Sequence, residues 1–97
     1  MSLQTKVVAT AQAVGQSAAV AMNVTPFMAR NSAVCILTSS SDRVVKLQES
    51  DDNVTFTDVA GVTLSAGTDR FPITLAAYHR IDVSGGTAGT GDCDIEA

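Results

Sequence analysis

The chain has 97 residues, a formal net charge of −4 and a hydrophobic content of 45%, and this length corresponds to one domain. Two lysines and four arginines cannot form the basic surface that phosphate groups require, so we expect neither nucleic-acid binding nor attachment to an anionic membrane. Fourteen alanines and 12 valines stand against four aromatic residues, so the predicted core is thin. A thin core gains stability from partner subunits, and we therefore expect a homo-oligomer, either a dimer or a trimer.

Residues 1–29 are almost uncharged, because Lys6 is their only ionisable side chain. The alanine-rich stretch 11–22 has helix propensity, but Gly15 and the alternation of apolar residues over 18–24 favour a strand. A neutral segment of small residues is poorly suited to a solvated surface. It is either a docking arm or edge strand that adds to another subunit, or a pair of central strands within the fold.

Strand patterns dominate from Ser32 onward. The apolar run 33–38 is bounded by polar turn residues, as expected for a buried strand. Residues 43–50 alternate, with Val45 and Leu47 on one face, and predict a half-exposed strand. Turn residues 50–53 then connect this strand to a second one, so the two strands form a hairpin.

The remaining strands follow at intervals of about ten residues, which is typical of an antiparallel sandwich or barrel. Pro72 places its strand at a sheet edge, because proline cannot donate to a central ladder. A glycine-rich connection over 84–91 leads into a last strand with acidic residues outward and apolar residues inward. The predicted strands after the turn are 54–58, 62–64, 71–75, 78–83 and 92–96. We therefore predict an all-β, antiparallel β-sandwich, jelly-roll-like or Ig-like, with about 7–8 short strands in a single domain over 1–97.

Three groups of residues resemble chemical sites, and each has a simpler explanation. Serines 39–41 with His79 lack the strained elbow that a nucleophile needs. The oxygen-bearing side chains of Asp51, Asp52, Asn53 and Asp58 lack the calcium-loop pattern, and the first three fit a hairpin turn. The glycines over 86–91 lead into a strand, whereas a phosphate loop opens a helix. We therefore assign no catalytic, cofactor-binding or metal-binding residue, and expect a protein that is not an enzyme and needs no cofactor.

The two cysteines, Cys35 and Cys93, allow one disulfide between distant strands or two buried thiols. We expect no secretory signal, because the first apolar stretch, 7–9, is too short. Polar residues also interrupt the uncharged stretch 7–29, so we expect no membrane span. Free thiols are the favoured interpretation in a chain that stays in a reducing compartment.

Two segments carry a resemblance to a known group of proteins. Residues 45–59, VKLQESDDNVTFTDV, and residues 78–83, YHRIDV, are similar to the hairpin and return strand of small β-sandwich proteins in tailed-bacteriophage virions. They resemble discoidin-like carbohydrate-binding modules more distantly. Asn53 stands where such turns commonly carry glycine. The core positions that the resemblance implies are Val45, Leu47, Phe56, Ile81 and Val83.

The resemblance implies a non-enzymatic virion protein, assembled in the host cytoplasm. Such proteins include capsid decoration or cement proteins, head fibres and tail or neck components. The expected partner is the major capsid protein or another virion protein, and the expected role is to bind and stabilise the shell. The alternative is a tail, neck or adhesion module that binds a glycan or another virion protein, although this chain has no tryptophan and one tyrosine to form a sugar platform.

Overall fold

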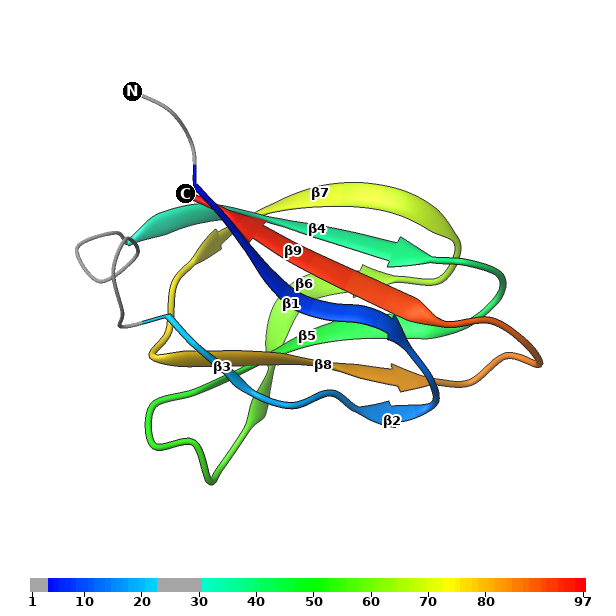
Figure 1. Cartoon of the computed structure of the whole chain (residues 1–97), viewed down its shortest axis with the longest axis horizontal. Coiled ribbons are helices and arrows are strands. Elements are labelled where there is room, and N and C mark those ends of the chain that lie inside the picture. Colours follow the sequence, from blue (N-terminus) through cyan, green and yellow to red (C-terminus); the bar gives the residue numbers. More distant parts are fainter. Residues whose placement is uncertain (1–3, 23–30) are drawn as a thin grey trace.

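The computed structural model describes residues 4–22 and 31–97 and consists there of nine antiparallel strands without a helix. The strands form two sheets that pack face to face (Figure 1). Sheet A has the order β1-β9-β4-β7, and sheet B has the order β2-β8-β5-β6 with β3 also paired to β8. The strands are β1 Thr5–Gln12, β2 Gly15–Gln16, β3 Val20–Ala21, β4 Ser32–Ser39, β5 Val44–Ser50, β6 Thr57–Leu64, β7 Gly67–Thr74, β8 Tyr78–Ser84 and β9 Gly91–Glu96.

β2 and β3 are two parts of one interrupted strand, since both pair with β8. Ser17 lies in the interruption and replaces the missing ladder bonds. Its N–H donates to the carbonyl of Ile81 at 2.9 Å, and its Oγ accepts the N–H of Ile81 at 2.9 Å. The fold therefore has eight strand positions, four in each sheet.

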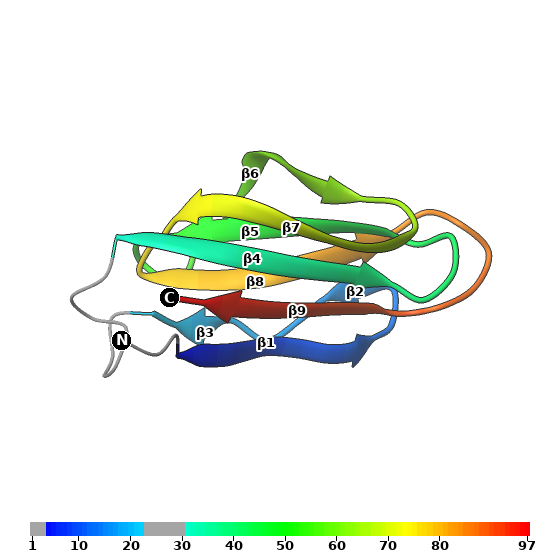
Figure 2. The same cartoon turned by 90° about the horizontal axis from the view of Figure 1, so that it is seen from above.

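The connectivity is that of a jelly roll. Successive strand positions alternate between the two sheets, except for the β5–β6 hairpin within sheet B. Figure 2 shows β9, the last strand, lying between β1 and β4. Two four-stranded sheets joined in this way form the eight-stranded jelly roll, which confirms the predicted antiparallel sandwich and selects the jelly-roll alternative.

The core lies between the sheets and comes from alternate residues of the central strands. In β8, for example, His79, Ile81 and Val83 face inward while their neighbours are partly exposed. Four of the five implied core positions are fully buried, but Phe56 is only half-buried and lies outside the core cluster. The buried apolar residues are Val8, Met22, Ala33, Cys35, Leu37, Val45, Leu47, Val62, Ile73, Ile81, Val83, Cys93, Ile95 and Ala97.

The hairpin partner differs most from the prediction. Residues 54–56 are not a strand, and the predicted strands 54–58 and 62–64 are replaced by the single strand β6. Lys46 pairs with Thr63, and Gln48 pairs with Asp58. The single β5 residue between them, Leu47, therefore lies opposite four residues of the bulged strand β6. Gly61 permits this bulge with a positive φ of 77°.

The N-terminal segment forms one edge of each sheet. β1 pairs with β9 at the edge of sheet A, while β2 and β3 pair with β8 at the edge of sheet B. The strand predicted from the alternation over 18–24 is thus represented by the short strand β3. Val24, which belongs to that alternation, and the rest of the range 23–29 lie outside the described residues.

Candidate functional site

The structure does not bring together the residues of the hypothetical hydrolytic site. Ser39 ends β4 and pairs with Gly91, whereas His79 lies near the start of β8 and pairs with Glu49. These positions are at opposite ends of the sandwich. The Ser39 hydroxyl also donates to the carbonyl of Arg43 at 2.8 Å, so its local role is to close the turn after β4.

His79 is fully buried, and both ring nitrogens have backbone partners. Nδ1 bonds the carbonyl of Gln48 at 3.0 Å, and Nε2 accepts the N–H of Ala76 at 3.1 Å. This pair of bonds fixes the neutral tautomer that carries its proton on Nδ1. Burial lowers the pKa of His79 below its usual 6.5, although the bond to Gln48 opposes that shift. The imidazole therefore acts as a structural bridge between β5 and the β7–β8 connection.

The acidic turn after β5 is built by its own side chains. Ser50 Oγ accepts the N–H groups of Asp52 and Asn53 and donates to Asp52 Oδ1 at 3.0 Å. Asp52 Oδ1 accepts the N–H groups of Thr55 and Val54, each at 2.9 Å, and these bonds lower the pKa of Asp52. Asn53 has a φ of 62°, a conformation that asparagine tolerates as glycine does. The conformation of the turn is therefore held by hydrogen bonds of its own side chains.

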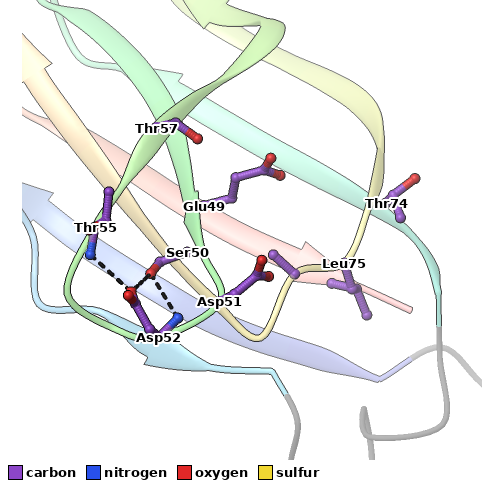
Figure 3. Close-up of a pocket in the computed structure, with 9 residues that line it drawn as sticks. Glu49, Ser50, Asp51, Asp52, Thr55, Thr57, Thr74 and Leu75 are labelled. Atoms are coloured by element: carbon purple, nitrogen blue, oxygen red, sulfur yellow. Dashed lines mark hydrogen bonds between the residues drawn. The ribbon is translucent and has the colours of Figure 1, made fainter.

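A cavity of about 520 Å³ opens beside this turn (Figure 3). Its hydroxyl and carboxylate groups come mainly from β5 and the turn, and its apolar part comes from the β7–β8 connection. Figure 3 shows Glu49 and Asp51 extending toward this connection, while Asp52 is turned to the backbone of its own turn. The lining residues are Glu49, Ser50, Asp51, Asp52, Thr55, Thr57, Thr74, Leu75 and Ala76.

The outer face of sheet B is covered by a closed polar network. Asp58 lies 3.9 Å from Lys46 Nζ and accepts a hydrogen bond from Gln48 Nε2 at 3.0 Å. Arg80 Nε donates to Gln48 Oε1 at 2.8 Å, and the Arg80 guanidinium lies 3.9 Å above the centre of the Phe56 ring. Phe56 thus packs on the outside of the sheet, and Asp58 is separated from the acidic turn.

The glycine-rich loop over 85–90 is held by the loop that joins β4 and β5. Asp42 Oδ1 accepts the N–H groups of Ala88 at 3.0 Å and Thr87 at 2.9 Å, and these bonds lower the pKa of Asp42 to about 2. Arg43 donates to the carbonyls of Gly85 at 2.7 Å and Gly89 at 3.1 Å. Sequence reasoning missed this clamp, because the two loops are more than 40 residues apart and share no motif.

The outer face of sheet A is acidic and partly apolar. Cys93 and Ile95 of β9 point inward, so Asp92, Asp94 and Glu96 form a row on the opposite side. Around this row lie Val7, which is 56% exposed, and the partly exposed residues Val34 and Ile36. Arg70 is the cation paired with this row, at 2.7 Å from Glu96. The Asp92 carboxylate accepts the N–H of Ala11, so two of the three carboxylates in the row have partners within the chain.

Each free sheet edge is interrupted. β1 shifts register between Val7 and Ala9 and again before Gln12, while β2 and β3 are separated by three residues. β6 carries the bulge described above, and β7 contains Pro72, as predicted for an edge strand. Interruptions of this kind protect edges from pairing with another chain. The edges of both sheets therefore offer few uninterrupted backbone groups to an added strand.

The two cysteines are free and fully buried on neighbouring strands of sheet A. Their Sγ atoms lie 3.5 Å apart. The hydrogen bond with Cys35, together with burial, raises the pKa of the Cys93 thiol far above its usual range.

No protein-family model, curated protein or solved structure matches the chain. Among residues 4–22 and 31–97, no three potential metal-ligating side chains gather in one place. No helix in that part of the chain could cross a membrane.

Proposed function

We propose that the protein is a structural component of a tailed-phage virion, and specifically a decoration or cement protein that binds the capsid shell. The carrying observation is the jelly-roll connectivity, since viral capsid proteins and lectins both use this architecture. The similarity of residues 45–59 and 78–83 to small β-sandwich proteins of phage virions supports a capsid-associated protein over a lectin. A protein that binds only the assembled shell stabilises it by mass action.

The outer face of sheet A is the surface that we assign to shell contact. It combines exposed apolar side chains with the carboxylates of Asp92, Asp94 and Glu96. Such a surface complements a shell region that carries lysine or arginine beside apolar residues. The outer face of sheet B is a poorer candidate, because it mixes the cations Lys46 and Arg80 with Asp58 and Asp82, whereas the sheet A row sets three carboxylates against Arg70.

Co-sedimentation with phage particles tests the proposal. Particles are purified from induced cultures of the strain that carries the gene, stripped of loosely bound proteins, and mixed with the purified chain. We expect the chain to sediment with the particles and to raise the temperature at which they release DNA. A chain that stays in the supernatant at micromolar concentration would contradict the proposed function.

Charge reversal then identifies the contact face. Asp94→Lys changes the centre of the sheet A face, and Asp82→Lys is the control on the outer face of sheet B, where Asp82 lies opposite Lys46 in the strand register. We expect Asp94→Lys to weaken particle binding at least tenfold, roughly the loss of one interfacial charge pair, and Asp82→Lys to bind like wild type. Equal binding by both variants would show that the shell contact does not involve the outer face of sheet A. It would not contradict binding to the shell itself.

Glycan binding is the second candidate, and the cavity beside the acidic turn favours it. A volume of about 520 Å³ is in the range of small-ligand sites, and hydroxyl and carboxylate groups can bond sugar hydroxyls. Among the described residues that line the cavity, none has an aromatic ring to stack on a sugar face. A glycan array decides this point: specific binding that Asp51→Ala abolishes would favour the adhesion module over the decoration protein.

A further inference from the structure

The cysteine pair belongs to the hydrophobic core, on the inner face of sheet A. Cys35 belongs to β4 and Cys93 to β9, the two central strands of sheet A. Cys35 pairs with Ile95, and Cys93 pairs with Leu37. The two cysteines are therefore diagonal neighbours on the same inner face, with their sulfur atoms 3.5 Å apart and with no exposed surface.

We propose that Cys35 and Cys93 are a cross-linking site, at which a small disulfide oxidant joins β4 to β9 through a reversible intramolecular disulfide. The inference concerns the fold of sheet A and does not depend on the proposed virion function. The sulfur atoms already lie 3.5 Å apart, so the bond forms once a further approach of the two strands brings them to about 2 Å.

The reaction is thiol–disulfide exchange with an oxidant such as oxidised glutathione. One cysteine thiolate attacks a sulfur of the oxidant, forms a mixed disulfide and releases one glutathione thiolate. The second cysteine thiolate attacks the protein sulfur of the mixed disulfide and releases the second glutathione. The two protons lost by the cysteines are taken up by the two glutathione molecules, and the chain is oxidised by two electrons.

Burial determines when this reaction occurs. Neither thiol is accessible in the closed sandwich, and buried thiols far from positive charge react slowly. The first step therefore takes place during folding or local opening, and pairing of β4 with β9 then delivers the second thiol. Diagonal sheet neighbours are farther apart than opposed residues, so closure draws the strands together and gives a bond that mild reductants break.

Refolding in oxidised glutathione tests the proposal. The denatured, reduced chain is diluted into buffer with the oxidant, and mass spectrometry follows thiol alkylation. We expect a monomer that has lost two hydrogen atoms, resists alkylation, and keeps the far-ultraviolet circular dichroism spectrum of the reduced protein. A low concentration of dithiothreitol should restore both thiols.

Cys35→Ser and Cys93→Ser are the matched controls, since each retains one thiol in the same environment. Each should acquire one glutathione and form no internal bond. The proposal is overturned if the refolded wild-type chain keeps two free thiols or carries two glutathiones. It is also overturned if the cross-linked chain loses the β-sheet spectrum, because the bond would then require a non-native register.

Discussion

Single side chains in this protein replace backbone partners that the strands do not supply. His79 does so inside the core, where its two nitrogens bond the carbonyl of Gln48 and the N–H of Ala76. Asp42 does so on the surface, where its carboxylate gathers the N–H groups of Ala88 and Thr87. Both groups function in one protonation state, so the fold responds to pH at these two residues in different ranges.

We expect the free energy of unfolding to decrease as the pH falls below about 6.5, the usual pKa of histidine. In the unfolded chain His79 takes up a proton near this pH, whereas burial lowers its pKa in the folded chain. The unfolded state therefore binds more protons, and the loss is at most about 1.4 kcal/mol per pH unit. Urea unfolding at pH 7.5 and 5.5 measures it.

His79→Gln serves as the control, because glutamine can bond both backbone groups without titrating in this range. The variant should lose most of the difference in unfolding free energy between pH 7.5 and 5.5. An equal difference in wild type and variant would show that carboxylates, and not His79, cause the pH dependence.

Asp42 should titrate at a much lower pH. Its pKa is lowered to about 2 by hydrogen bonds from Ala88 and Thr87, so its contribution to folding is present above its ordinary pKa of 3.8 and is lost as the pH falls through 2. The amide NMR signals of Thr87 and Ala88 should shift with a midpoint near pH 2. Asp42→Asn should remove this transition, and a midpoint near 4 would contradict the clamp.

At the scale of elements, the strands of the second half are predictable because alternation and turn residues are local signals. β4, β5, β8 and β9 begin and end within one or two residues of the predicted limits. β6 was predicted wrongly because its limits depend on distant contacts. Phe56 stacks on Arg80, which is 24 positions away in the sequence, and is therefore removed from the strand.

The start of β9 crosses the core closely, and Gly91 makes this possible. A Cβ atom at Gly91 would lie 2.7 Å from Val45 Cγ2 and 2.9 Å from Val83 Cγ2. We expect Gly91→Ala to destabilise the fold by about 1–3 kcal/mol, since overpacking forces neighbouring side chains or the backbone to move. Thermal unfolding measures this effect.

Thr63→Ala, at an exposed position of β6, is the comparison for Gly91→Ala. Surface substitutions away from special features change stability by about 0.5 kcal/mol or less. If the two variants unfolded at the same temperature, the close approach of Gly91 to β5 and β8 would be wrong.

At the scale of the whole molecule, the two ends of the described chain close one sheet. Gln4 and Ala97 exchange backbone hydrogen bonds at 2.8 and 2.9 Å, and β1 covers the edge of β9. Strand order could not be predicted from the sequence, because nothing in the residues around Thr5 indicates that it pairs with Glu96. The candidate surfaces could not be predicted either, since the face of sheet A is assembled from four separate segments.

Deleting residues 1–12 should therefore unfold most of the protein. The deletion exposes β9 along its length and removes the buried Val8, and a loss of about 3 kcal/mol or more is a large part of the 5–15 kcal/mol that small domains possess. Circular dichroism should show a weaker and less cooperative thermal transition. Val7→Thr, at an exposed site of β1, should unfold like wild type, and a folded deletion variant would show that β1 is dispensable.

The pairing of β1 with β9 also sets the order of events during synthesis. β1 cannot find its partner until residues 91–96 have left the ribosome, and β2 and β3 must wait for β8. At roughly 5–20 residues per second, the N-terminal segment stays unpaired for several seconds. Alanine has a low β-propensity, so the small, neutral residues of this segment suit a stretch of nascent chain that must avoid premature partners.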